Sequence, residues 1–177
     1  MSLFMEKKEF AKINFFPIHF FAKESLNTVT DSIFMSCKAE MLSGGINAII
    51  EKHPLYISRC VFIKCTSRSS SGAIFISANS VRVESCCLIG CYSETDCCAV
   101  RIKSRIFPTS TLTIDQIMVQ SCPDFTKGQR CAFFGAGSFD MRYINFSNCY
   151  MLETEGINFW IPEYETSLNF ILMVNDV

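Results

Sequence analysis

The 177-residue chain lacks any long apolar run and any long run of one charge. No apolar stretch reaches the roughly 18 residues that a membrane-spanning helix needs, so no transmembrane segment is expected. The net charge of −1 comes from 16 Lys and Arg against 17 Asp and Glu, without a basic cluster. Because binding to nucleic acid needs a dense cationic surface, we expect no nucleic-acid partner.

Histidine is scarce, and the common cofactor and metal motifs are missing. His19 lies in an apolar run and His53 precedes a proline, and neither has a convincing nucleophile nearby. The chain contains no P-loop, no G-x-G-x-x-G, no H-E-x-x-H and no C-x-x-C pair. We therefore predict no cofactor and no metal site.

The amino-terminal segment is a poor match to a signal peptide. Lys7 and Lys8 precede an apolar stretch, but further charges and Pro17 interrupt it, and no small-residue cleavage site follows cleanly. Localisation is therefore unknown from the sequence.

Apolar residues are abundant by comparison. They make up 49% of the chain, whereas charged residues make up 19%, which excludes a disordered protein and indicates a large core. The length suits one domain over residues 1–177. Eleven cysteines are too few for a disulfide scaffold, and their number is odd.

A repeat ending in cysteine runs through the chain. Its terminal residues are Cys37, Cys65, Cys91, Cys122 and Cys149, separated by 28, 26, 31 and 27 residues. Residues three, five, eight and ten before each cysteine are apolar, except Asn27 and Ser32, and the residues between them are mostly polar. Because side chains alternate along a strand, an interval of three predicts a bend at which two residues point outward. Each copy therefore predicts two short strands and two corners.

A third apolar segment follows each cysteine and begins with small residues, as in GGINAII and SGAIFIS. Three short strands in about 27 residues, without a helical run, are typical of a solenoid. We predict an all-β fold, a right-handed parallel β-helix of about five coils with incomplete end coils. Residues 27–160 hold the repeat coils, and residues 1–26 hold a partial coil or an amino-terminal cap.

Residues 161–177 are expected to start a further, truncated coil. Leu168 and Phe170 follow Phe139 and Met141 by 29 residues, which predicts that these pairs stack. Neither terminus clearly supplies a polar cap, which also suits a fragment of a longer protein. Uncapped end coils would permit end-to-end self-association.

The five repeat cysteines are predicted to form an inward ladder in the core. Position five before each of them is occupied by Ser32, Cys60, Cys86, Ile117 and Ile144. Buried free thiols fit such a column best. Stacked disulfides such as Cys60–Cys86 are an alternative of doubtful geometry, and zinc is disfavoured because the column accepts Ile and Ser.

Glu84, Asp115 and Arg142 are the candidate catalytic residues, since they fall in one outward column on successive coils, beside Asp31 and Arg59. Two carboxyl groups about 5 to 5.5 Å apart suit retaining glycoside hydrolysis. The alternative is a solvated surface, on which charges of both signs are expected. We expect the phenylalanines to pack in the core. Asn145 of the N-x-S sequon is expected to face outward, because it lies between the inward residues Ile144 and Phe146.

The stretches SGAIFISANSVRVESCCLIGC and INFSNC resemble the repeats of polymorphic outer-membrane surface proteins, and more widely the pectin-lyase-like superfamily. The resemblance covers roughly residues 27–160, with SGA in place of GGA and FSNC carrying Cys where the bacterial pattern has Asn. It implies a cell-surface or secreted adhesion-type module, with polysaccharide lyases and hydrolases elsewhere in the superfamily.

We therefore predict a non-enzymatic structural or adhesion-type module. Its outer loops, especially residues 92–96, 103–111 and 123–130, would face a protein or glycan partner. The alternative is a carbohydrate-active enzyme, a polysaccharide lyase or glycoside hydrolase, that uses the three candidate residues above.

Overall fold

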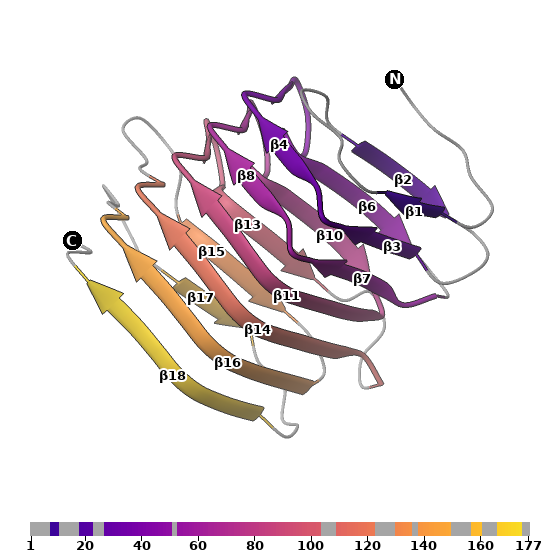
Figure 1. Cartoon of the computed structure of the whole chain (residues 1–177), viewed down its shortest axis with the longest axis vertical. Helices are drawn as coiled ribbons and strands as arrows, with labels where there is room; N and C mark the ends of the chain where they lie inside the picture. The colour runs from indigo at the N-terminus through magenta and orange to yellow at the C-terminus, as the bar shows by residue number, and fades with distance from the viewer. Residues whose placement is uncertain are drawn as a thin grey trace.

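The computed structural model describes residues 8–10, 18–22, 27–50, 53–103, 109–122, 130–135, 138–149, 157–160 and 166–174. The regular structure in these residues is entirely β-strand. No α-helix in this part of the chain has the length and apolarity needed to cross a lipid bilayer. The strands stack rung upon rung along one axis, from the amino-terminal strands at one end to β18 at the other (Figure 1).

Sheet 1 forms the long face of the stack. In spatial order it contains β1 (Lys8–Phe10), β3 (Asn27–Thr30), β7 (Leu55–Ser58), β11 (Ser80–Ile89), β14 (Thr111–Gln120), β16 (Ser138–Ser147) and β18 (Thr166–Val174), with β4 (Ile33–Met35) and β8 (Val61–Ile63) beside the path. Its strand pairs are parallel.

Sheet 2 lies behind sheet 1 in Figure 1. It contains β2 (Ile18–Ala22), β6 (Ile46–Ile50), β10 (Ile74–Ala78), β13 (Cys97–Lys103), β15 (Arg130–Gly135) and β17 (Ile157–Trp160). These parallel strands are the predicted third strand of each copy. The chain passes from sheet 1 to sheet 2 and back on each turn, so the prediction of a right-handed parallel β-helix is confirmed.

The predicted inward columns are confirmed by the strand register. Phe34 pairs with Phe62, Phe62 with Leu88, and Leu88 with Val119. All of these side chains are buried, and the Phe34 and Phe62 rings stack with centroids 4.7 Å apart. The interior between the sheets is therefore a series of apolar ladders.

The bend between each pair of strands has a definite backbone cause. The residue six before each repeat cysteine has a positive φ: Asp31, Arg59, Ser85, Gln116 and Tyr143, with Phe170 in the same place on β18. The residue just before each cysteine does too: Ser36, Lys64, Gly90, Ser121 and Asn148. One left-handed residue turns the chain and leaves two neighbouring side chains outside. In β11, β14, β16 and β18 the strand continues through the bend, whereas two separate strands per copy were predicted.

The sequence also gave no indication of sheet 3, which contains β5 (Lys38–Ala39), β9 (Thr66–Ser67) and β12 (Tyr92–Ser93). These two-residue strands follow the repeat cysteines, where we expected only a variable polar turn. After them, Gly45 shows why sheet 2 segments start with small residues. A Cβ atom on Gly45 would lie 2.5 Å from the Ala73 carbonyl oxygen, so only glycine fits there.

The stacking predicted for the last coil is wrong by two residues. Leu168 pairs with Met141, and Thr166 pairs with Phe139. Phe170 instead occupies the bend with a φ of 54°, and its ring stacks on Tyr143 with centroids 5.3 Å apart. The register of β18 is set by the bend, because Phe170 must lie beside the bend residue Tyr143 of the preceding rung. The apolar pattern in the first half of β18 does not indicate this register.

Several predicted features fall wholly or partly outside the described residues. In the amino-terminal segment, β1 pairs with β3 and β2 with β6, while the rest of residues 1–26 and the side chain of His19 lie outside the description. Most of the predicted binding loops 103–111 and 123–130 also lie outside it, and loop 92–96 lies within it.

Candidate functional site

The three residues predicted as a catalytic group lie in one row across sheet 1. Glu84 on β11 pairs with Asp115 on β14, and Asp115 pairs with Arg142 on β16. Neighbouring strands are about 4.8 Å apart, so the backbones of Glu84 and Asp115 are close enough for their carboxyl groups to share one ligand. Each residue precedes the bend and points outward from the strand that carries it.

Glu84 is held by two neighbours. The Tyr56 hydroxyl donates a hydrogen bond of 2.6 Å to Glu84 Oε2, and the Arg82 guanidinium forms an ion pair with Oε1. The Tyr56 hydrogen bond, with the contribution of Arg82, lowers the pKa of the Glu84 carboxyl. Glu84 is therefore kept ionised, which suits a hydrogen-bond acceptor or a nucleophile and not a general acid.

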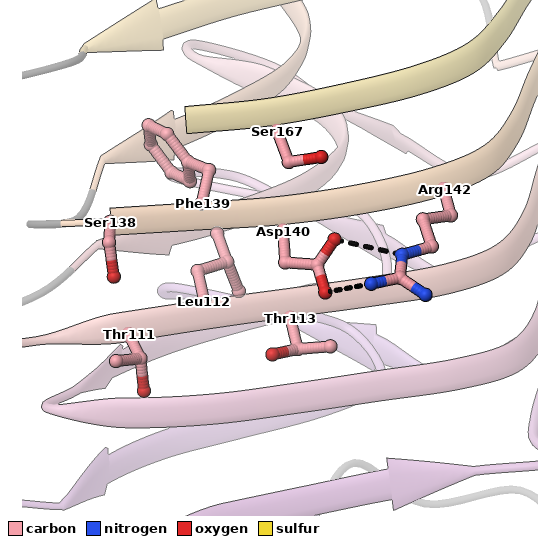
Figure 2. Close-up of a pocket in the computed structure, with 8 residues that line it drawn as sticks. All are labelled: Thr111, Leu112, Thr113, Ser138, Phe139, Asp140, Arg142 and Ser167. Atoms are coloured by element: carbon pink, nitrogen blue, oxygen red, sulfur yellow. Dashed lines mark hydrogen bonds and ion pairs between the residues drawn. The ribbon is translucent and has the colours of Figure 1, made fainter. Parts of the chain in front are cut away.

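Asp115 and Arg142 do not form an ion pair with each other. Arg142 instead forms a two-pronged pair with Asp140 on its own strand, with Nε–Oδ1 and Nη2–Oδ2 distances of 2.9 and 2.8 Å (Figure 2). This pair raises the pKa of Arg142. Asp115 is half-buried, and its Oδ1 atom has no hydrogen-bond partner among the described residues.

Sequence reasoning missed Arg82 and Asp140, which lie two residues before Glu84 and Arg142. Residues two apart on a strand share a face. The position nine residues before each repeat cysteine therefore faces outward next to the position seven before it, and this spacing could have identified Arg82 and Asp140. Together these two columns place Arg82, Thr113, Asp115, Asp140 and Arg142 around a small depression, which Ile114 also lines.

A second, more open depression lies beside the first, toward the start of the strands. Its lining residues are Thr111, Leu112, Thr113, Ser138, Phe139, Asp140, Arg142 and Ser167. Figure 2 shows the hydroxyl groups of these residues on three successive strands, next to the Asp140–Arg142 pair. Hydroxyl groups both donate and accept hydrogen bonds, and the carboxylate accepts them, so this surface can pair with a polyhydroxylated ligand.

The other charged residues of the predicted face form separate surface pairs. Arg59 makes a two-pronged contact with Asp31 on the preceding rung, with distances of 2.6 and 2.7 Å. Hydrogen bonding from Arg59 lowers the pKa of Asp31. Both side chains are about half exposed, so this pair belongs to a solvated surface of low energetic weight.

The five repeat cysteines lie in the interior between the sheets and are all buried. Each sulfur lies near the backbone carbonyl oxygen of the residue two before it, and Cys65 Sγ is also 3.4 Å from Phe34 O. Burial raises the pKa of Cys91, which disfavours the reactive thiolate. No disulfide bond joins the cysteines with described side chains, and no metal-binding group of three His, Cys, Asp or Glu residues occurs in the described part of the chain.

Two further candidates take no part in these clusters. His53 is half-buried at the start of the segment before β7. Asn145 of the sequon is half-buried on β16, where it pairs with Met118 and Leu172 on the neighbouring strands. His53 lies before β7, and Asn145 lies beyond the bend from Arg142 on β16, so neither belongs to the Glu84–Asp115–Arg142 row.

No protein-family model, curated protein or solved structure matches the chain. The assignment of the fold therefore rests on the strand pairing described above.

Proposed function

We propose that this chain is a non-enzymatic, adhesion-type β-helix module that binds a glycan on the outer face of sheet 1. The observation that carries the proposal is the open depression beside Asp140 and Arg142, with its hydroxyl groups on three successive strands. A cell-surface or secreted location and kinship with pectin-lyase-like proteins belong to the same proposal. The predicted loop 92–96 follows the opposite, carboxyl-terminal end of β11 and would form a separate contact surface.

Geometry and charge both support a sugar ligand. Thr111 and Ser138 are register partners on neighbouring strands about 4.8 Å apart, and in the adjacent column Asp140 lies between Thr113 and Ser167. The two-pronged contact holds the Asp140 carboxylate and the Arg142 guanidinium in fixed directions, which lowers the entropy lost on binding. The carboxylate would accept hydrogen bonds from sugar hydroxyls, and the guanidinium would donate to ring or glycosidic oxygens.

A glycan array followed by calorimetry on the purified chain tests the proposal. Asp140→Asn should weaken binding at least about 10-fold, because it removes a charged acceptor and disturbs the Arg142 pair. Asp31→Asn is the matched control, since Asp31 forms a similar two-pronged pair with Arg59 on the same sheet, several strands away. Absence of glycan binding by the wild type, or equal weakening by both variants, would reject the proposal.

A carbohydrate-active enzyme is the second candidate, favoured by the pairing of Glu84 with Asp115 on adjacent strands. In that case Glu84, kept ionised by Tyr56 and Arg82, would be the nucleophile or base, and Asp115 the acid. Release of reducing or unsaturated ends from a polysaccharide panel, lost in Glu84→Gln, would support this function. A wild-type chain that cleaves no polysaccharide in the panel would reject the enzymatic function.

A further inference from the structure

β18 forms an unprotected edge of sheet 1. One edge of this strand pairs with β16, and its other edge is unpaired within the described part of the chain. Natural edge strands are commonly protected by charge, proline, a bulge or short length. β18 is nine residues long, TSLNFILMV, with neither charge nor proline, whereas β1 at the opposite edge has three residues that include Lys8 and Glu9.

This edge exposes the columns that are buried elsewhere in the β-helix. Leu168 is 42% exposed, although Met141, its partner in the same column, is fully buried. Met173 is 50% exposed, although its column partner Phe146 is 1% exposed. The edge therefore presents a cross-section of the apolar core, which a further rung would cover.

The backbone of β18 is oriented to accept such a rung. The carbonyl oxygens of Ser32 and Cys60, both inward residues, accept hydrogen bonds of 2.9 and 3.0 Å from Val61 N and Cys87 N on the following rung. Inward residues of this column thus turn their carbonyl groups toward the carboxyl-terminal end of the stack. Ile171 occupies the same column on β18, so its carbonyl group faces the free edge.

The order of side chains along β18 identifies the occupant. By register with β16, the inward residues are Leu168, Ile171 and Met173, and the outward residues are Ser167, Asn169, Phe170 and Leu172. This order is the same in both directions from the bend between Asn169 and Phe170. An antiparallel copy of the strand, paired about the bend, therefore places Leu168 opposite Ile171 and Ser167 opposite Leu172, so that inward residues face inward ones and outward residues face outward ones.

The hydrogen bonding agrees with this pairing. In an antiparallel ladder, two opposite residues that turn their polar groups toward each other form a hydrogen-bonded pair. In the proposed pair, the inward residues of each strand turn their backbone polar groups toward the other strand. The reason is that a two-fold axis perpendicular to the sheet at the bend keeps inward side chains inward and brings the two free edges face to face. A regular strand could not match in this register, and the left-handed residue Phe170 makes it possible.

We propose that β18 pairs antiparallel with β18 of a second copy of this chain, about a two-fold axis through the bend. Sheet 1 then continues across both copies, and the exposed core columns cover each other. The interface is closed, so the assembly stops at a dimer. This proposal does not depend on glycan binding, although Ser167 on the outer face of β18 also lines the depression proposed for the glycan.

Analytical ultracentrifugation of the 177-residue chain over a dilution series tests the interface. The wild type should show a monomer–dimer equilibrium. Leu168→Lys should weaken dimerisation at least about 30-fold, because it places a charge inside the interface. Leu172→Lys is the matched control, since Leu172 is 54% exposed and outward-facing, and it should leave the dimer within a few fold of wild type.

Circular dichroism checks that each variant keeps its β structure, and Met173→Lys replaces Leu168→Lys if the latter fails to fold. A wild type that is monomeric at every concentration would overturn the proposal, as would growth beyond a dimer. Equal weakening by the inward and outward lysine variants would overturn it too, because that result indicates unspecific apolar contact.

Discussion

At the scale of single residues, the fold depends on side chains that occupy one column from rung to rung. Phe62 is fully buried and lies between Phe34 and Leu88 in such a column. Outward residues next to it on the same strand, Val61 and Ile63, are only partly buried. The same substitution should therefore cost very different amounts on the two faces of one strand.

Phe62→Ala should lower the free energy of unfolding by about 3–5 kcal/mol, because it removes a buried ring and leaves a cavity that stacked rungs cannot close. Tyr92→Ala, at a position 43% exposed, should change it by less than about 1 kcal/mol. Urea denaturation of both variants gives the comparison. Similar losses in the two would show that Phe62 is not part of the packed interior.

The charge of Glu84 should add a pH-dependent term to stability. Its carboxyl pKa is lowered in the folded chain by the Tyr56 hydroxyl and by Arg82, so the stabilisation is present above the unfolded value of about 4.3. This stabilisation is lost as the pH falls through the folded pKa. Glu84→Gln should therefore be less stable than wild type near neutral pH, with the difference shrinking on acidification below about pH 4.3.

Denaturant titrations at several pH values measure this difference. Glu94→Gln, at an exposed position on the loop after β12, serves as the control. A constant difference between Glu84→Gln and wild type across the acid range would contradict the assigned contacts.

At the scale of elements, the corners decide the shape of each turn. Residues with side chains occupy the left-handed conformation at most corners, which costs each of them roughly 1–2 kcal/mol relative to ordinary backbone. Gly90 is the exception in the column just before the repeat cysteines. The neighbouring rung has Lys64 at the same corner, with a φ of 51°.

Gly90→Ala should destabilise the chain by about 1 kcal/mol. The nearest atom to the new Cβ, Lys64 Cγ, would lie 3.6 Å away, so the loss reports the backbone conformation and not a clash. Lys64→Gly should act in the opposite direction, by about 0.5–1 kcal/mol at most. Thermal unfolding of both variants tests the pair, and effects of the same sign would contradict it.

At the scale of the whole molecule, each rung contacts only its neighbours. Stability in such a stack is a sum of rung and interface contributions, so the end rungs should open more often than the middle ones. Cys91 lies in the middle of the cysteine column, whereas Cys149 lies one rung from the exposed strand β18. Both sulfurs are buried, so their reaction with an alkylating agent requires opening.

Pulsed alkylation with peptide mass spectrometry should therefore label Cys149 at least about tenfold faster than Cys91, a difference of ~1.4 kcal/mol in opening free energy. Equal rates would indicate that the chain opens only as one unit. The same spectra distinguish free thiols from a Cys60–Cys86 disulfide, because a disulfide leaves both residues unlabelled until reduction.

The sequence by itself determined the fold class, the inward columns and the bends of the five copies that end in cysteine. Repetition does this, because a position occupied by apolar side chains in five copies can only be a buried column in a stack. The outward row of Glu84, Asp115 and Arg142 followed from the same alignment. Whether a side chain faces inward or outward can thus be predicted from the local sequence pattern of each copy.

The tertiary structure alone decided which outward groups pair and how the last rung stacks. Arg142 contacts Asp140 on its own strand, and Glu84 contacts Tyr56 and Arg82, because side chains choose partners by direction and distance. Phe170 takes the bend and shifts β18 by two residues, because its backbone must continue the corner below it. Such choices depend on neighbours that are distant in the sequence, and the sequence pattern does not record them.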